Sequence, residues 1–148
     1  MSLFDLTGRV ALVTGGARGL GEASSRALAR LGAVIVLSDI DAEAASATAD
    51  RLATETGGQV LSRECNVTDP DDVDRLVSGL IEALGRLDIL VNNAGIHRRV
   101  DPLDYDPDDV EAILAVNFRG AFQVAARAGR EMTRLGGGSI AVSYTHLT

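Results

Sequence analysis

The segment Val10–Gly21, which reads VALVTGGARGLG, decides the fold of this chain. It runs an apolar strand pattern directly into three spaced glycines, and a helical pattern follows. Gly15 permits a tight turn, Gly19 removes a Cβ where the backbone would approach a phosphate, and Gly21 permits close packing of helix on strand. The start of the helix offers unpaired amide donors and a partial positive charge. The segment therefore predicts a site for the diphosphate of a nucleotide.

Composition restricts the class of protein. The 148 residues suffice for one domain, with 46% hydrophobic and 24% charged residues, as in globular proteins. Its 14 basic and 21 acidic side chains give a net charge of -7, which argues against a nucleic-acid partner. We find no apolar run of membrane-spanning length and no secretion-signal pattern. A single cysteine, Cys65, excludes an internal disulfide. We therefore expect a cytoplasmic protein without a membrane partner, and no metal site.

Strand and helix patterns alternate along the whole chain. Strands are predicted over 9–14, 33–39, 59–67, 87–92 and from 139, and helices over 19–31, 41–56, 69–84 and 106–135. Two helix starts are marked by an acidic N-cap followed by proline, at Asp69-Pro70 and Asp106-Pro107. Strands separated by helices of this length form a parallel sheet. The fold class predicted is α/β, a doubly wound parallel sheet of the Rossmann type that ends after its fifth strand.

An acid ends the second predicted strand. Asp39 stands eighteen positions after Gly21, where a carboxylate accepts hydrogen bonds from the hydroxyls of an adenosine ribose and repels a 2′-phosphate. Arg18 favours NADP instead, because a basic residue in the glycine loop can reach that phosphate. Ile40 adds no second positive charge. The pattern therefore favours NAD over NADP as the cofactor.

A second motif, Asn92-Asn93-Ala94-Gly95, gives a specific resemblance. Together with the glycine segment it is similar to the short-chain dehydrogenase/reductase family, over Leu6 to Ile140. The resemblance implies that residues 93–95 lie against the cofactor and brace the sheet, and that Asn66-Val67 holds the adenine. It also implies that Asn117 helps to order a water in the proton relay. The predicted cofactor-binding residues are Gly15, Arg18, Gly19, Leu20, Gly21, Asp39, Asn66, Val67, Asn93, Ala94 and Gly95, and the predicted catalytic residue is Asn117.

The family's Tyr-x-x-x-Lys pair is absent from these residues. Tyr144 is followed four positions later by Thr148 instead of lysine. Back-translation of Val142–Leu147 resembles the transposase mosaic end used in sequencing libraries. We therefore expect a cofactor-binding domain over 1–141 that is incomplete at its C-terminus. We hypothesise a non-native tail over 142–148 and expect no turnover by the chain as given.

The substrate and the class of function stay open at this point. His97-Arg98-Arg99 follows the second motif, where paired guanidinium groups suit the carboxylate of a sugar acid. The resemblance implies a small-molecule substrate, with alcohol and carbonyl interconverted, and a 3-oxoacyl reductase is the alternative within the family. Outside the family, the glycine segment also suits an S-adenosylmethionine-dependent methyltransferase or a non-catalytic dinucleotide-binding module. The helix predicted over 106–135 resembles the family's dimer-forming helix, so we expect the intact protein to be a homo-oligomer.

Overall fold

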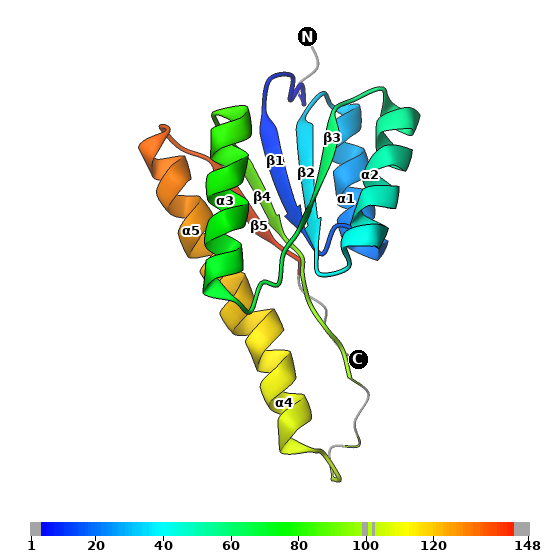
Figure 1. Cartoon of the computed structure of the whole chain (residues 1–148), viewed down its shortest axis with the longest axis vertical. Helices are drawn as coiled ribbons and strands as arrows, with labels where there is room; N and C mark the ends of the chain where they lie inside the picture. The colour runs from blue at the N-terminus through cyan, green and yellow to red at the C-terminus, as the bar shows by residue number, and fades with distance from the viewer. Residues whose placement is uncertain (1–3, 99–100, 102, 144–148) are drawn as a thin grey trace.

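A strand without a single exposed residue, β1 (Val10–Thr14), lies at the centre of the structure. The computed structural model describes residues 4–98, 101 and 103–143. Around β1 they form a five-stranded parallel sheet in the order β3-β2-β1-β4-β5 (Figure 1). The other strands are β2 (Val34–Asp39), β3 (Val60–Glu64), β4 (Ile89–Asn92) and β5 (Ser139–Val142). The strand order reverses direction between β1 and β4, which confirms the predicted doubly wound fold.

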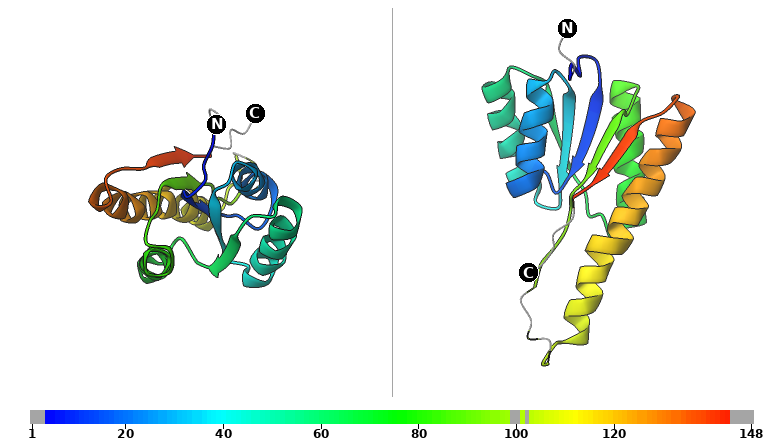
Figure 2. Two further views of the ribbon diagram at one scale, coloured as in Figure 1. Left: turned by 90° about the horizontal axis from the view of Figure 1, so that it is seen from above. Right: turned by 180° about the vertical axis from the view of Figure 1, so that it is seen from behind.

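Alternate residues of β1 belong to two separate hydrophobic cores, one on each face of the sheet. Val10 and Leu12 pack with α3 (Pro70–Leu84) and α5 (Ala121–Arg134), while Ala11 and Val13 pack toward α1 (Gly19–Arg30) and α2 (Ala42–Thr56). Seen from above, the two helix pairs cover opposite faces of the sheet (Figure 2). Because both faces are covered, the central strands read as continuous apolar runs instead of alternating ones.

Acidic caps begin the helices as the sequence predicts. The carboxylates of Asp69 and Asp106 accept hydrogen bonds from the amides two residues later, each at 2.9 Å, and proline occupies the first turn of both helices. Asp41 caps α2 by accepting from the Ala44 amide at 3.0 Å. These bonds satisfy amide groups that otherwise lack a partner within the helix.

The helix predicted over 106–135 is present without a break, but its helical geometry changes along its length. It consists of α4 (Pro107–Ile113), a π-helical segment η1 (Leu114–Gly120) and α5. The side-chain amide of the buried Asn92 donates to the Ala121 carbonyl at 2.6 Å, at the start of α5. The Ala121 carbonyl therefore accepts a hydrogen bond from a side chain of the sheet, and side chains that bond to helical carbonyls in this way accompany local changes of helix geometry. This contact joins residues 29 apart, so the helical pattern alone did not predict it.

Several boundaries differ from the sequence prediction by one or two residues, and the end of the third strand differs most. The third strand ends at Glu64 instead of residue 67, because the chain turns where the Asp72 carboxylate accepts from the Asn66 amide at 3.1 Å. At the other end of the sheet, Val142 still pairs with Asn92, and the Ser143 amide donates to the Asn92 carbonyl at 3.0 Å. The remainder of the hypothesised tail, 144–148, lies outside the described residues. Within the described ranges, no helix is both long and apolar enough to cross a membrane.

Candidate functional site

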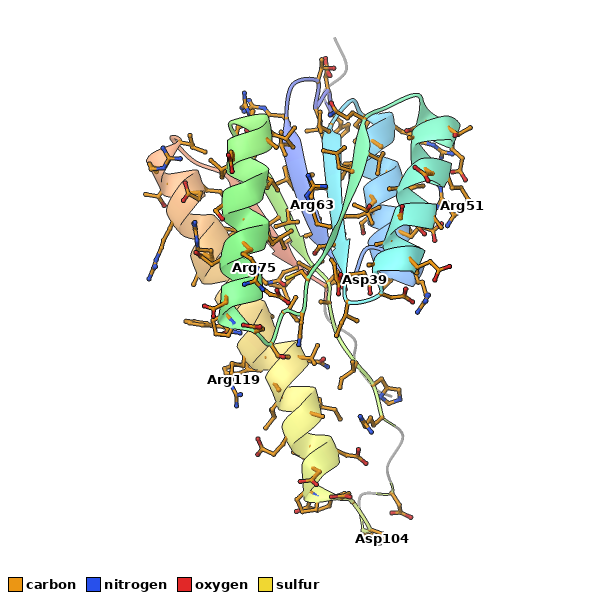
Figure 3. All side chains as sticks on the ribbon, viewed as in Figure 1. Asp39, Arg51, Arg63, Arg75, Asp104 and Arg119 are labelled. Atoms are coloured by element: carbon orange, nitrogen blue, oxygen red, sulfur yellow. The ribbon has the colours of Figure 1, made fainter. Side chains whose placement is uncertain are left out.

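Four segments meet at the carboxyl edge of the sheet, on both sides of the point where the strand order reverses. The glycine loop follows β1, Asp39 ends β2, residues 65–68 follow β3, and residues 93–96 follow β4. Asp39 lies at this edge, and α4 projects beyond the edge, away from the strands (Figure 3). In doubly wound sheets this edge is where ligands bind.

The glycine loop depends on its missing side chains. Gly15 has φ +61° and lies under the second motif, where a Cβ would approach the Ala94 Cα to 2.9 Å. Gly19 has φ +56°, and a Cβ there would meet no atom within 4 Å. Gly19 is the first residue of α1, and the N-cap residue before it, Arg18, has extended backbone and makes no side-chain capping hydrogen bond among the described residues. Leu20 beside it is exposed. The amides of Gly16 and Ala17 donate to the Ser38 carbonyl and to Asp39 Oδ2, whereas the amides of the first turn of α1 have no partner within the helix and can meet an anion.

Thr14 joins the two motifs. Its hydroxyl oxygen accepts from the amides of both Asn93 and Ala94 at 3.0 Å, and the residue is fully buried. The Asn93 side-chain amide donates back to the carbonyls of Thr14 and Gly15 at 3.2 and 3.1 Å. Asn93 thus braces the glycine loop. Thr14 was not among the predicted site residues, although a polar residue that ends a buried strand just before the first glycine was the available signal.

The Asp39 carboxylate is held by two backbone amides. Its Oδ2 accepts from Ala17 at 3.2 Å, and its Oδ1 accepts from Asp41 at 3.1 Å. Each carboxylate oxygen can accept more than one hydrogen bond, so both keep capacity for ribose hydroxyls. The half-buried carboxylate is fixed in orientation before any ligand arrives.

Arg18 is paired within the chain. Its Nη2 forms an ion pair with Asp41 Oδ2, while Oδ1 of the same carboxylate caps α2. The Ala44 amide, and then the Arg18 guanidinium, hold the pKa of Asp41 below its usual value. The predicted basic group of the glycine loop is therefore directed onto the N-terminus of α2.

The far side of the loop is anchored by α2. The buried Thr48 hydroxyl donates to the Ala17 carbonyl at 2.8 Å, and Arg51 donates to that hydroxyl at 3.1 Å. Arg51 (Figure 3) also donates to Glu22 in the first turn of α1 at 2.7 Å. The glycine loop is thus fixed from α1, α2 and β4 together.

The segment after β3 is shaped by its own hydrogen bonds. Asn66 Oδ1 accepts from both the amide and the hydroxyl of Thr68, at 3.0 and 2.8 Å. This oxygen therefore shapes a turn within the segment to which the resemblance assigns the adenine. The buried Val67 carbonyl accepts from Gln123 at 3.0 Å.

Burial raises the pKa of the neighbouring Cys65 thiol to about 11, which makes it unreactive at neutral pH.

Asn117 lies in the π-helical segment and grips the loop after β4. Its Oδ1 accepts from the Ile96 amide at 2.8 Å, and its Nδ2 donates to the Ile96 carbonyl at 2.9 Å. Gly95 lies against it, since a Cβ there would stand 3.3 Å from Asn117 Oδ1. The Asn117 side chain therefore positions the loop after β4.

On the predicted substrate side, one of the two guanidinium groups is engaged. Arg98 forms an ion pair with Asp109 of α4 at 2.9 Å, and Arg99 lies outside the described residues. All 14 basic residues of the sequence are arginines, so no lysine is present to partner a tyrosine. Among the described residues, no group of three His, Cys, Asp or Glu side chains could hold a metal ion.

The arrangement defines a class of protein. A glycine turn leads into the first amides of α1 at the switch point, and a carboxylate is fixed at the end of the neighbouring strand. This combination is typical of sites for the diphosphate and ribose of a dinucleotide. The carboxylate is oriented by Ala17 of the turn itself, so both parts of the site belong to one unit. The fold and site are those of a dinucleotide-binding α/β protein.

Comparison with known proteins gives the family. The family model for short chain dehydrogenases matches residues 9–143. D-threitol dehydrogenase of Mycolicibacterium smegmatis is 38% identical over 137 residues, which cover 93% of this chain and 52% of that protein. 5-keto-D-gluconate 5-reductase of Escherichia coli is 34% identical over 138 residues, covering 93% and 54%.

Solved structures agree. A short-chain type dehydrogenase/reductase from Mycobacterium marinum superposes with a TM-score of 0.91 at 36% identity, covering 96% of this chain and 59% of that one. An NAD⁺-bound xylitol dehydrogenase superposes with a TM-score of 0.89 at 33% identity, covering 93% and 53%. The chain belongs to the short-chain dehydrogenase/reductase family of oxidoreductases, which bind a nicotinamide dinucleotide. This excludes the methyltransferase alternative. The chain spans about half the length of the curated relatives it matches.

Proposed function

We propose that the protein is an NAD-dependent oxidoreductase and that these residues form its cofactor-binding part. The observation that carries this proposal is the Asp39 carboxylate, which the amides of Ala17 and Asp41 hold in one orientation at the end of β2. A fixed negative charge there accepts from two ribose hydroxyls and opposes a 2′-phosphate. NADP is the less favoured cofactor.

We propose a small polar alcohol or carbonyl compound as the substrate. Relatives named for a polyol and for a keto sugar acid support this class. A 3-oxoacyl reductase of Synechocystis, 35% identical over 138 residues, supports the alternative within the family. The pairing of Arg98 with Asp109 neutralises one charge that a sugar-acid carboxylate would use. A neutral polyol therefore fits the described residues better than an acid does.

The roles of the chain's own residues follow from the contacts. When bound, the nicotinamide supplies hydride transfer to or from the carbon that carries the oxygen. The glycine turn holds the diphosphate, Asp39 orients the ribose, and Asn117 keeps the loop after β4 in place. The family's proton transfer needs a tyrosine next to a lysine. These 148 residues contain no lysine, so we expect them to bind the cofactor without turnover.

The test is ligand binding by the 148-residue chain. Saturation-transfer NMR detects weak binding, and it would be recorded with NADH, NADPH and S-adenosylmethionine. We expect NADH to bind more tightly than NADPH, and Asp39→Asn to weaken NADH binding about tenfold through loss of charged hydrogen bonds. Tighter binding of NADPH than of NADH by the wild-type chain would refute the proposal.

We further propose that the intact protein is a homo-oligomer. Phe118 and Phe122 are 71% and 67% exposed on one long helix. Large exposed apolar side chains on neighbouring turns are typical of a surface that pairs with another chain. Analytical ultracentrifugation should give a dimer or larger assembly that Phe118→Glu dissociates. A wild-type protein that stays monomeric at high concentration would refute this.

A further inference from the structure

The glycine loop carries one basic side chain, and that side chain is already paired. Arg18 meets Asp41, the N-cap of α2, in an ion pair whose side chains are 74% and 40% exposed. Asp41 lies two residues beyond Asp39 and donates its own amide to the Asp39 carboxylate at 3.1 Å. Two acids and one arginine are therefore linked between the end of β2 and the start of α2, where the proposed function puts the ribose.

The two acids act on a 2′-phosphate in different ways. Asp39 repels the phosphate as a like charge. A free arginine would attract it, because guanidinium groups form paired, charge-assisted hydrogen bonds with phosphate. Asp41 occupies the Arg18 guanidinium and so removes this attraction.

We propose that Asp41 is a second specificity-determining residue, which excludes NADP by keeping Arg18 on the N-terminus of α2. The inference rests on the proposed NAD-dependent function. Asp41 then acts on selectivity together with Asp39, and Arg18 has a partner within the chain instead of a role in binding NADP.

The position of Asp41 is fixed independently of Arg18. Its Oδ1 accepts from the Ala44 amide at 3.0 Å as the helix cap, which leaves Oδ2 directed at the guanidinium. Arg18 has extended backbone (φ -149°, ψ 166°) immediately before α1. The pair thus joins the starts of two helices, and the formal charge of Asp39, Asp41 and Arg18 sums to a net negative value.

The test is Asp41→Asn, because asparagine caps a helix as well as aspartate does. The variant removes the charge and keeps the cap. Dissociation constants of the 148-residue chain for NADH and NADPH would be measured by NMR titration. We expect the ratio of the two constants to move about fivefold toward NADPH, near the upper limit for an exposed ion pair. Glu43→Gln, on the exposed first turn of the same helix, is the matched control and should change the ratio less than about twofold because its charge is screened.

The double variant Arg18→Gln/Asp41→Asn separates the proposed mechanism from simple charge repulsion. If Asp41 acts through Arg18, the shift toward NADPH disappears when the arginine is absent. A shift that persists in the double variant, or an unchanged ratio in Asp41→Asn, would overturn the assignment of Asp41 while NADH binding still supports the proposed function. Binding of neither dinucleotide by the wild-type chain would overturn the proposed function, and this inference with it.

Discussion

The replacement Gly21→Ala tests whether the glycine loop and the second motif form one packed unit. A Cβ at this position would overlap the Gly15 carbonyl oxygen and would lie 2.7 Å from Asn93 Nδ2. Relieving the overlap must move the loop or break the bond from Asn93 to Gly15, which is 3.1 Å long. Overpacking costs about 1–3 kcal/mol and the lost hydrogen bond about 1 kcal/mol, while better helix propensity returns about 1 kcal/mol.

The expected net loss is therefore about 2 kcal/mol, which lowers the melting temperature by about 4–8 °C for a chain of this length. Circular dichroism melts and urea denaturation measure it. The control is Gly79→Ala in α3, where a Cβ would meet no atom within 4 Å. That variant should gain about 0.5–1 kcal/mol, because alanine is favoured within a helix. If Gly21→Ala proved as stable as the wild-type chain, the described packing of α1 on the loop would be wrong.

Three further predictions concern groups beneath the site and on the opposite edge of the sheet. Arg86, the Val10 amide and Arg9 hold the pKa of Asp88 at about 2, against a usual 3.8. The Asp88 carboxylate therefore adds to the free energy of unfolding above about pH 5, and this stabilisation is lost as the pH falls through about 4 to 2. Urea denaturation should show Asp88→Asn less stable by about 1–2 kcal/mol at neutral pH, and a difference that did not shrink in acid would contradict this. Thr14→Val leaves two amides unpaired and should lose about 2–4 kcal/mol of unfolding free energy, whereas Thr14→Ser should be close to wild type. Cys65 should resist iodoacetamide in the native chain and react after unfolding in urea, as mass spectrometry would show, and rapid native labelling would disprove its burial.

Local signals in the sequence were sufficient for most of the fold. The acidic caps at Asp69 and Asp106 depend on backbone groups two residues away, so the sequence placed both helix starts correctly. Asp39 also fell at the end of its predicted strand. These features are predictable because nearby residues along the chain determine them.

The remaining features depend on contacts between distant segments. The ion pair of Arg18 with Asp41 joins residues 23 apart, and the bond from Thr48 to Ala17 joins residues 31 apart. Asn66 shows the same limit at short range, because its oxygen could face a ligand or its own turn, and the sequence does not decide between them. The π-helical segment likewise ends next to Ala121, which the Asn92 side chain contacts from the sheet, and helical periodicity does not encode this contact.

The hydroxyl of Thr14 has a consequence for how the chain folds. It binds amides 79 and 80 positions further along, in the loop after β4. Such bonds form only after a large loop of chain has closed, which makes them late and slow relative to local helices. A ribosome that had released β1, α1 and β2 would therefore present the glycine turn unbraced. Competence for ligand binding would arise abruptly, when β4 inserts beside β1.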